Sequence, residues 1–207
     1  MIISHAHKFI FFAVPKTGTH AVREVLRMHL SADDWEQQML TGNQTLPIPE
    51  IAQIGHGHVT VREIRPYLSQ EIWNEYHKFA FIRNPYDRFV SVCAFLNRGN
   101  PAFARSPLQW MKEALNRPRF RERVLVREQF EQLCNEEREI GIDSVYRYEN
   151  LQESLDTVLA KMSLPSSPLS ILNSSEHKVY SEYYDEELKG LVQALYSTDI
   201  EEFNYTF

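Results

Sequence analysis

The chain has 207 residues, of which 43% are hydrophobic, and its 28 acidic residues outnumber its 22 lysines and arginines, giving a formal net charge of −6. This length favours a single domain, residues 1–207, with a sizeable core. The acidic balance argues against a nucleic-acid-binding protein, and no apolar run reaches the ~20 residues of a transmembrane helix. No signal-sequence pattern is present, and Cys93 and Cys134 suggest buried free thiols, so we expect a cytoplasmic protein.

Residues 8–30 predict a strand, a tight turn and a helix. Phe9–Val14 is a short apolar run that ends at Pro15, which is typical of a buried strand. Beyond Gly18 the spacing follows the period of a helix, with one face formed by Val22, Val25, Leu26 and His29. The turn at residues 15–20 therefore lies at a helix N-terminus, where unpaired backbone N–H groups and the helix dipole attract anions.

The side chains of this turn suit a phosphate. Lys16 supplies a mobile cation, Thr17 and Thr19 supply hydroxyl groups, and Gly18 allows the backbone to approach a ligand closely. The order differs from that of a Walker P-loop, because here the lysine precedes the only glycine. The residues alone leave two interpretations open: a phosphate-binding turn, or a strand-to-helix turn with a surface lysine.

A second strand–turn–helix unit follows at residues 78–96. Phe79–Ile82 predicts a strand, and Asn84 is a typical helix N-cap. Arg83 then lies at the end of the strand, and Ser91 lies two turns into the helix. Ligands of open α/β sheets bind at the carboxyl ends of the strands. Two units with a cation at this position therefore favour a phosphate site over a surface ion pair.

These stretches carry a resemblance. Val14–Thr19, VPKTGT, resembles the 5′-phosphosulfate loop of sulfotransferases that use 3′-phosphoadenylyl sulfate (PAPS), and Arg83–Ser91, RNPYDRFVS, resembles their 3′-phosphate motif. The order and separation of the two motifs also match. The branch that the chain resembles is the carbohydrate type, which includes heparan 2-O-sulfotransferases and many small bacterial proteins. The similarity continues through Arg147–Leu151 and residues 177–207.

The resemblance implies an α/β, P-loop-like three-layer fold, in which helices flank a central, mostly parallel sheet. It implies transfer of a sulfuryl group from PAPS to a hydroxyl group of a carbohydrate or glycolipid, leaving adenosine 3′,5′-bisphosphate. Lys16 would stabilise the leaving phosphate, so no metal is required. The cofactor-binding residues that the resemblance implies are Lys16, Thr17, Gly18, Thr19, His20, Arg83, Ser91 and Lys178.

Two histidines between glycines, at residues 55–59, are candidates for a catalytic base. We expect a short strand over residues 54–60 and a capping box in which Thr60 begins the next helix. A histidine suits proton removal at neutral pH. In the resembled family a histidine of a comparable segment acts as the base, which implies His58 first and His56 second. A structural hydrogen bond and a metal site are the alternatives, although no ligand cluster is near.

The chain departs from the resembled family at His20, where many members have Ser or Thr. This ring either donates to the phosphate or competes with His58 for the role of base. Elsewhere, residues 31–50 predict a short helix around Trp35 followed by a loop. Residues 99–140 predict helices, and residues 142–146 predict a third strand leading into Arg147–Glu149, which we interpret as scaffold, and a helix.

Five arginines lie close together in the helical part of the chain: Arg117, Arg119, Arg121, Arg123 and Arg127. A solvated face balanced by nearby glutamates is one interpretation. The other is a basic rim for an acidic or sugar-bearing acceptor.

Two other functions compete with sulfuryl transfer. A P-loop kinase would need the missing Gly-Lys-Ser/Thr order and an Asp that holds magnesium. A non-catalytic nucleotide-binding module would keep Lys16 and Arg83 and lack a base, and the two histidines of residues 55–59 argue against it.

Overall fold

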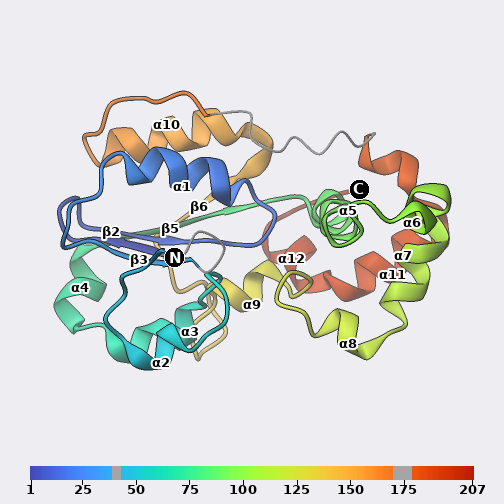
Figure 1. Ribbon diagram of the computed structural model, residues 1–207, viewed down its shortest axis with the longest axis horizontal. Helices are drawn as coiled ribbons and strands as arrows, with labels where there is room; N and C mark the ends of the chain where they lie inside the picture. The colour runs from blue at the N-terminus through green and yellow to red at the C-terminus, as the bar shows by residue number, and fades with distance from the viewer. Residues whose placement is uncertain (39–42, 170–178) are drawn as a thin grey trace. The chain divides into compact units, whose positions relative to one another are not determined.

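The computed structural model describes residues 1–38, 43–169 and 179–207, which form two compact units (Figure 1). Unit 1 comprises Met1–Ile82 and Glu131–Leu172, and unit 2 comprises Arg83–Phe130 and Asn173–Phe207. In these described ranges, no helix is both long enough and apolar enough to cross a membrane.

Unit 1 contains a sheet with the strand order β4-β3-β1-β2-β5-β6. The strands are β1 (Ile2–Ser4), β2 (Phe9–Phe12), β3 (Trp35–Gln38), β4 (Asn43–Gln44), β5 (His77–Ile82) and β6 (Ser144–Arg147). β2, β5 and β6 are parallel to one another, with Phe11 opposite Phe79 and Phe79 opposite Ser144. β1, β3 and β4 join through antiparallel pairs. The predicted α/β class and its parallel strands are confirmed.

Helices cover both faces of this sheet (Figure 1). On one face lie α1 (Thr19–Arg27) and α10 (Leu151–Lys161), and on the other lie α2 (Pro49–Ala52), α3 (Val61–Ile64) and α4 (Gln70–Glu75). Two short 3₁₀ helices, η1 (Arg65–Tyr67) and η2 (Tyr148–Asn150), complete the unit. The result is the predicted three-layer arrangement, with the sheet in the middle.

Aromatic side chains fill the space between the sheet and the first pair of helices. Phe11 and Phe79 stack with their ring centroids 5.4 Å apart, and Val22 of α1 and Leu155 of α10 pack in the same buried cluster. The apolar run of Phe9–Val14 is buried completely, as expected for a strand that is covered on both faces.

Two expectations for unit 1 are wrong. Trp35 begins a strand rather than a helix, because Trp35 and Glu36 pair with Ile3 and Ile2 of β1. Residues 54–60 form turns rather than a strand. The capping box after them is confirmed, since the Thr60 hydroxyl accepts the N–H of Glu63 at 3.1 Å and the Glu63 carboxylate accepts the N–H of Thr60 at 2.7 Å.

Unit 2 is helical. Its helices are α5 (Pro85–Leu96), α6 (Pro101–Arg105), α7 (Pro107–Leu115), α8 (Pro118–Arg121), α11 (Glu186–Leu195) and α12 (Ser197–Glu202), with a 3₁₀ helix η3 (Tyr180–Tyr183). A further helix, α9 (Gln129–Leu133), lies at the point where the chain passes from unit 2 to unit 1. Proline occupies the first position of α5 to α8, where its missing N–H costs nothing. Within the stretch predicted to be helical, Pro107 and Pro118 are therefore the starts of separate helices.

The core of unit 2 surrounds a buried ion pair. The side chains of Arg88 and Asp199 are fully buried, with Nη2 of the arginine 4.0 Å from Oδ2 of the aspartate. Arg88 also donates to the carbonyl of Leu125 at 3.2 Å and lies over the ring of Tyr196, 5.0 Å from its centroid. Burial raises the pKa of Asp199, and Arg88 opposes that shift. Each charge therefore depends on the other, because a single buried charge without its partner is strongly unfavourable.

The two cysteines are buried free thiols, as expected. Cys93 lies on α5 in the core of unit 2, where burial raises the pKa of its thiol well above the usual value. Cys134 follows α9 and pairs through its backbone with Ile140. A raised thiol pKa makes both groups inert in ordinary conditions.

Candidate active site

The turn between β2 and α1 has an unusual backbone. Lys16 has a φ of 66° and Gly18 a φ of 76°, both in the left-handed region. Thr17 between them is fully buried, and its hydroxyl donates to the carbonyl of Val14 at 2.9 Å. The hydroxyl proton of Thr17 is thus used inside the turn. Backbone conformations of this kind are concentrated at functional sites, where surrounding contacts enforce them.

At the start of α1, backbone N–H groups are available to a ligand, because no side chain of the first turn caps them. Its first backbone hydrogen bond runs from the N–H of Val22 to the carbonyl of Gly18, at 3.1 Å. The preceding amides of residues 19–21 have no backbone acceptor within the described part of the chain, and the first turn of α1 contains neither a side-chain cap nor an acidic residue. These orphan N–H groups and the positive end of the helix dipole fit an anionic phosphate.

Gly18 is packed tightly against the residues that follow β6. A Cβ atom on Gly18 would lie 2.5 Å from Cδ2 of Leu151 and 3.3 Å from Cε2 of Tyr148. Tyr148 and Leu151 belong to the stretch 147–151 that the sequence singled out. Residues 147–151 therefore pack against the turn at Gly18, which agrees with the scaffold role expected for them.

His58 is fixed in one tautomer. Its Nδ1 lies 2.6 Å from the carbonyl oxygen of Ala13, and because a carbonyl only accepts, Nδ1 must carry the proton. Burial lowers the pKa of His58 to about 3, although the bond to Ala13 acts in the opposite direction, and Arg23 and His56 lower it further. The ring is therefore neutral at physiological pH, with the lone pair on Nε2.

His56 has the opposite tautomer. Its Nδ1 accepts the backbone N–H of His58 at 3.3 Å, and the two ring centroids are 6.0 Å apart. A neutral His56 thus carries its proton on Nε2. Of the two histidines predicted as the base, His58 is the one whose Nε2 can accept a proton.

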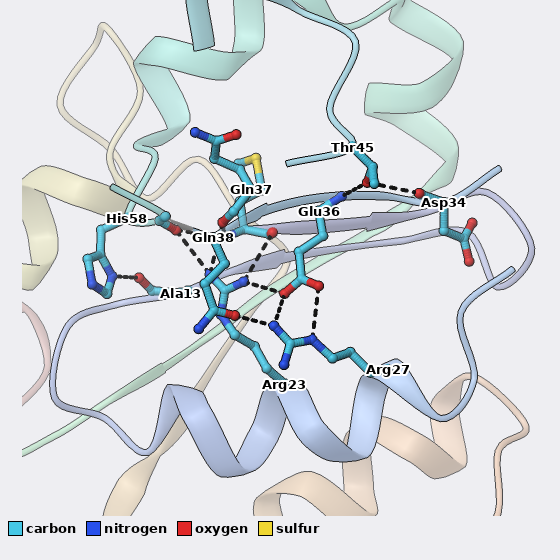
Figure 2. Close-up of polar contacts among 11 residues, drawn as sticks. Ala13, Arg23, Arg27, Asp34, Glu36, Gln37, Gln38, Thr45 and His58 are labelled. Atoms are coloured by element: carbon cyan, nitrogen blue, oxygen red, sulfur yellow. Dashed lines mark hydrogen bonds and ion pairs between the residues drawn. The ribbon is translucent and has the colours of Figure 1, made fainter. Parts of the chain in front are cut away.

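Two sets of contacts position His58, and Figure 2 shows its bond to the carbonyl of Ala13. The carbonyl of Ala13, which holds the ring, also accepts the side-chain amide of Gln132 at 3.0 Å. The carbonyl of Gly57, just before the histidine, accepts Nη2 of Arg23 at 3.1 Å. Ala13 ends the strand that leads into the turn and Arg23 lies on the helix that leaves it. The histidine is therefore tied to both sides of Pro15–Gly18.

Arg23 is held in turn by Glu36 of β3 (Figure 2). Glu36 is 5% exposed, and its Oε1 lies 2.7 Å from Arg23 and 2.8 Å from Arg27, both on α1. Arg27 also donates to the side chain of Gln38. Burial acts to raise the pKa of Glu36, and the two arginines overcome it and lower the pKa, so the carboxylate is ionised.

The other candidates of unit 1 and of the C-terminal region lie as follows. His20 is exposed in the first turn of α1, and burial together with the cations of Arg23 and Lys16 lowers its pKa. Thr19, the first residue of that helix, is buried. Lys178 lies outside the described residues.

In unit 2, Arg83 is buried and oriented by a network. Its Nε and Nη2 atoms both lie 2.8 Å from Oδ2 of Asp87, one turn further along α5. Its backbone N–H and carbonyl bond the side-chain amide of Gln129, each at 2.9 Å, and Gln129 is bonded by Asp199. Ser91 is buried on α5. Asn84 caps α5 as predicted, accepting the N–H of Tyr86 at 3.0 Å.

Comparison with known proteins identifies the family. A family model described as "Sulfotransferase family" matches residues 1–206. The chain therefore belongs to the sulfotransferase family, and its general activity is sulfuryl transfer. Comparisons with curated proteins and with solved structures gave no match. The parts of the chain that the structure describes hold no group of three or more His, Cys, Asp or Glu side chains able to bind a metal ion.

Replacing Gly18 by alanine should destabilise the protein by about 2–4 kcal/mol, because it adds a clash with Leu151 to a left-handed backbone. Gly55→Ala is the matched control, since a Cβ there meets no atom within 4 Å, and should change stability by less than ~0.5 kcal/mol. Urea unfolding measures both. Equal effects of the two variants would contradict the tight packing of the turn.

The His58 ring should remain neutral, with its proton on Nδ1, from pH 8 down to pH 5, because its pKa is about 3. Long-range ¹H–¹⁵N spectra of the imidazole nitrogens report the tautomer, and His58→Gln assigns the signals. An unfolded histidine titrates near pH 6.5, so His58 contributes stability that is complete above that pH and is lost as the pH falls towards 3. A His58 signal that titrates near 6.5 would refute this.

Proposed function

We propose that the protein transfers a sulfuryl group from PAPS to a hydroxyl group of an acceptor, a carbohydrate or glycolipid, as in the branch that includes heparan 2-O-sulfotransferases. The observation that carries the proposal is the left-handed turn at Lys16 and Gly18, which opens onto the orphan amides of α1 in a chain of the sulfotransferase family. The proposal treats residues 1–207 as one sulfotransferase domain.

The turn is assigned to the 5′ end of the donor. Bound PAPS would supply the sulfuryl group and a phosphate leaving group. The backbone N–H groups of residues 17–20 would hold the 5′-phosphate, and Lys16 would offset the negative charge that develops on it. Arg83 and Ser91 are assigned to the 3′-phosphate from their motif, and Lys178 is assigned to a further contact on the resemblance alone. Guanidinium groups pair well with phosphate oxygens.

His58 is the proposed base, with Nε2 taking the proton of the acceptor hydroxyl. A pKa of about 3 makes the free ring a weak base, since a general base works best near the operating pH. A negative charge close to a histidine raises its pKa. The ring is tied through Ala13 to the chain that enters the turn, so an anion held there would raise the basicity of His58. His56 is the second candidate.

The donor assignment is tested by calorimetric titration with adenosine 3′,5′-bisphosphate, AMP and ATP. We expect the bisphosphate to bind most tightly and Arg83→Ala to weaken it by ~10-fold or more, because hydrogen bonds to charged groups contribute about 1.5–3 kcal/mol. Ser91→Ala is a milder second variant, and the exposed Arg105→Ala, outside the motif, is the control. Equal binding of ATP with magnesium-dependent turnover would instead indicate a kinase. Binding without any turnover would indicate a nucleotide-binding module.

The base assignment is tested by release of adenosine 3′,5′-bisphosphate from PAPS with a panel of hydroxylated carbohydrates. We expect His58→Gln to lower kcat by about 10²–10⁴-fold, the usual contribution of a general base, with little change in donor affinity. His56→Gln, in the same turn, should lower kcat by less than ~10-fold. The reverse pattern would transfer the role to His56, and loss only in His20→Ala would transfer it to His20.

A further inference from the structure

A hollow of about 190 Å³ lies in unit 2, and none of the residues assigned above lines it. Its lining residues come from the last residue of α5, from α7 and α8, and from the segments next to α8: Leu96, Trp110, Ala114, Arg117, Arg119, Phe120 and Arg123. Three of the five clustered arginines therefore lie around one concave surface, whereas Arg121 and Arg127 do not line it.

The walls of the hollow are apolar and packed against neighbouring rings. Ala114 and Phe120 are buried in the core of unit 2. Trp110 is held edge-on between Phe103 and Phe120, with ring centroids 5.4 Å and 5.9 Å away. An engineered cavity of ~150 Å³ in another protein holds one benzene molecule. The hollow therefore has room for a single six-membered ring.

The rim of the hollow is positive. Arg117 lies 3.6 Å from Glu113, and both side chains are more than half exposed, so the pair is weak. The side chains of Arg119 and Arg123 make no hydrogen bond or ion pair with any described residue. The three arginines of the rim repel one another, since like charges at short distance are unfavourable. They lie together even though the whole chain has a net charge of −6. The solvent-exposed carboxylate of Glu113 does not neutralise three guanidinium groups, so the rim is complementary to an anion.

We propose that this hollow binds a small organic anion in which a single apolar six-membered ring carries an acidic group. The ring packs against Trp110 and Phe120, and the acidic group bonds the guanidinium groups of Arg119 and Arg123, whose fork geometry matches a carboxylate. A sugar acid fits less well, because its hydroxyl groups would face the apolar walls without hydrogen-bond partners. The inference does not rest on the proposed reaction.

Benzoate is the probe, titrated into the full chain labelled with 5-fluorotryptophan and followed by ¹⁹F NMR. The chain has three tryptophans, and we expect only the Trp110 resonance to shift, in a saturable manner. Arg119→Gln combined with Arg123→Gln should weaken binding by at least ~10-fold, equivalent to 1.4 kcal/mol. Arg121→Gln, the matched control in the same segment, should change it by less than ~2-fold. Ala114→Leu, which fills the hollow, should abolish binding.

Three further measurements test the proposal. Benzoate binding that persists in Lys16→Ala supports a site separate from the phosphate-binding turn. Acetate binding as tight as benzoate would show that the ring contributes nothing, and glucuronate binding tighter than benzoate would assign the hollow to an acidic sugar; either result overturns the proposal. Absence of a saturable Trp110 shift, or equal loss in Arg121→Gln, also overturns it.

Discussion

In unit 1 the buried carboxylate of Glu36 joins a helix to the sheet. Glu36 binds two arginines of α1 at once and thereby fastens that helix to β3 (Figure 2). A buried guanidinium is tolerated only when it is paired and hydrogen-bonded, and Arg23 meets this condition by also donating to the carbonyls of Gln37 and Gly57. The ion pair that fastens α1 to β3 thus also includes the arginine that bonds the backbone next to His58.

In unit 2 a buried carboxylate, that of Asp199, likewise accepts hydrogen bonds from a neighbouring segment. Asp199 accepts the N–H groups of Gln129 and Phe130, at 2.9 Å and 2.8 Å, and Gln129 closes on the backbone of Arg83. In both units, then, a buried carboxylate holds a polar side chain that bonds the backbone at or next to a candidate site residue: Arg23 next to His58, and Gln129 at Arg83. Removal of one member of such a network leaves a buried polar group without a partner, which destabilises the protein. We therefore expect few substitutions to be tolerated in either network.

The sequence predicts those parts of the fold whose burial leaves a local pattern of apolar residues. Short apolar runs predict β2 and β5, and apolar residues at helical spacing predict α1, α5 and α10. β3 was missed because its residues, Trp-Glu-Gln-Gln, carry no such repeat and are buried by partners on other elements. The same applies to the site. Lys16 and His58 stand in recognisable motifs, whereas Gln132 reaches Ala13 from 119 residues away, and no local pattern marks that contact.

The backbone of Lys16 has an evolutionary consequence. A left-handed conformation costs a residue other than glycine about 1–2 kcal/mol, and Lys16 adopts it with a φ of 66°. Glycine at this position would recover most of that energy and would remove the ammonium group. Under the role proposed for Lys16, selection for thermal stability and selection for catalysis act in opposite directions at this one position. A laboratory search for heat-resistant variants would then favour glycine at residue 16 and lose the proposed charge stabilisation.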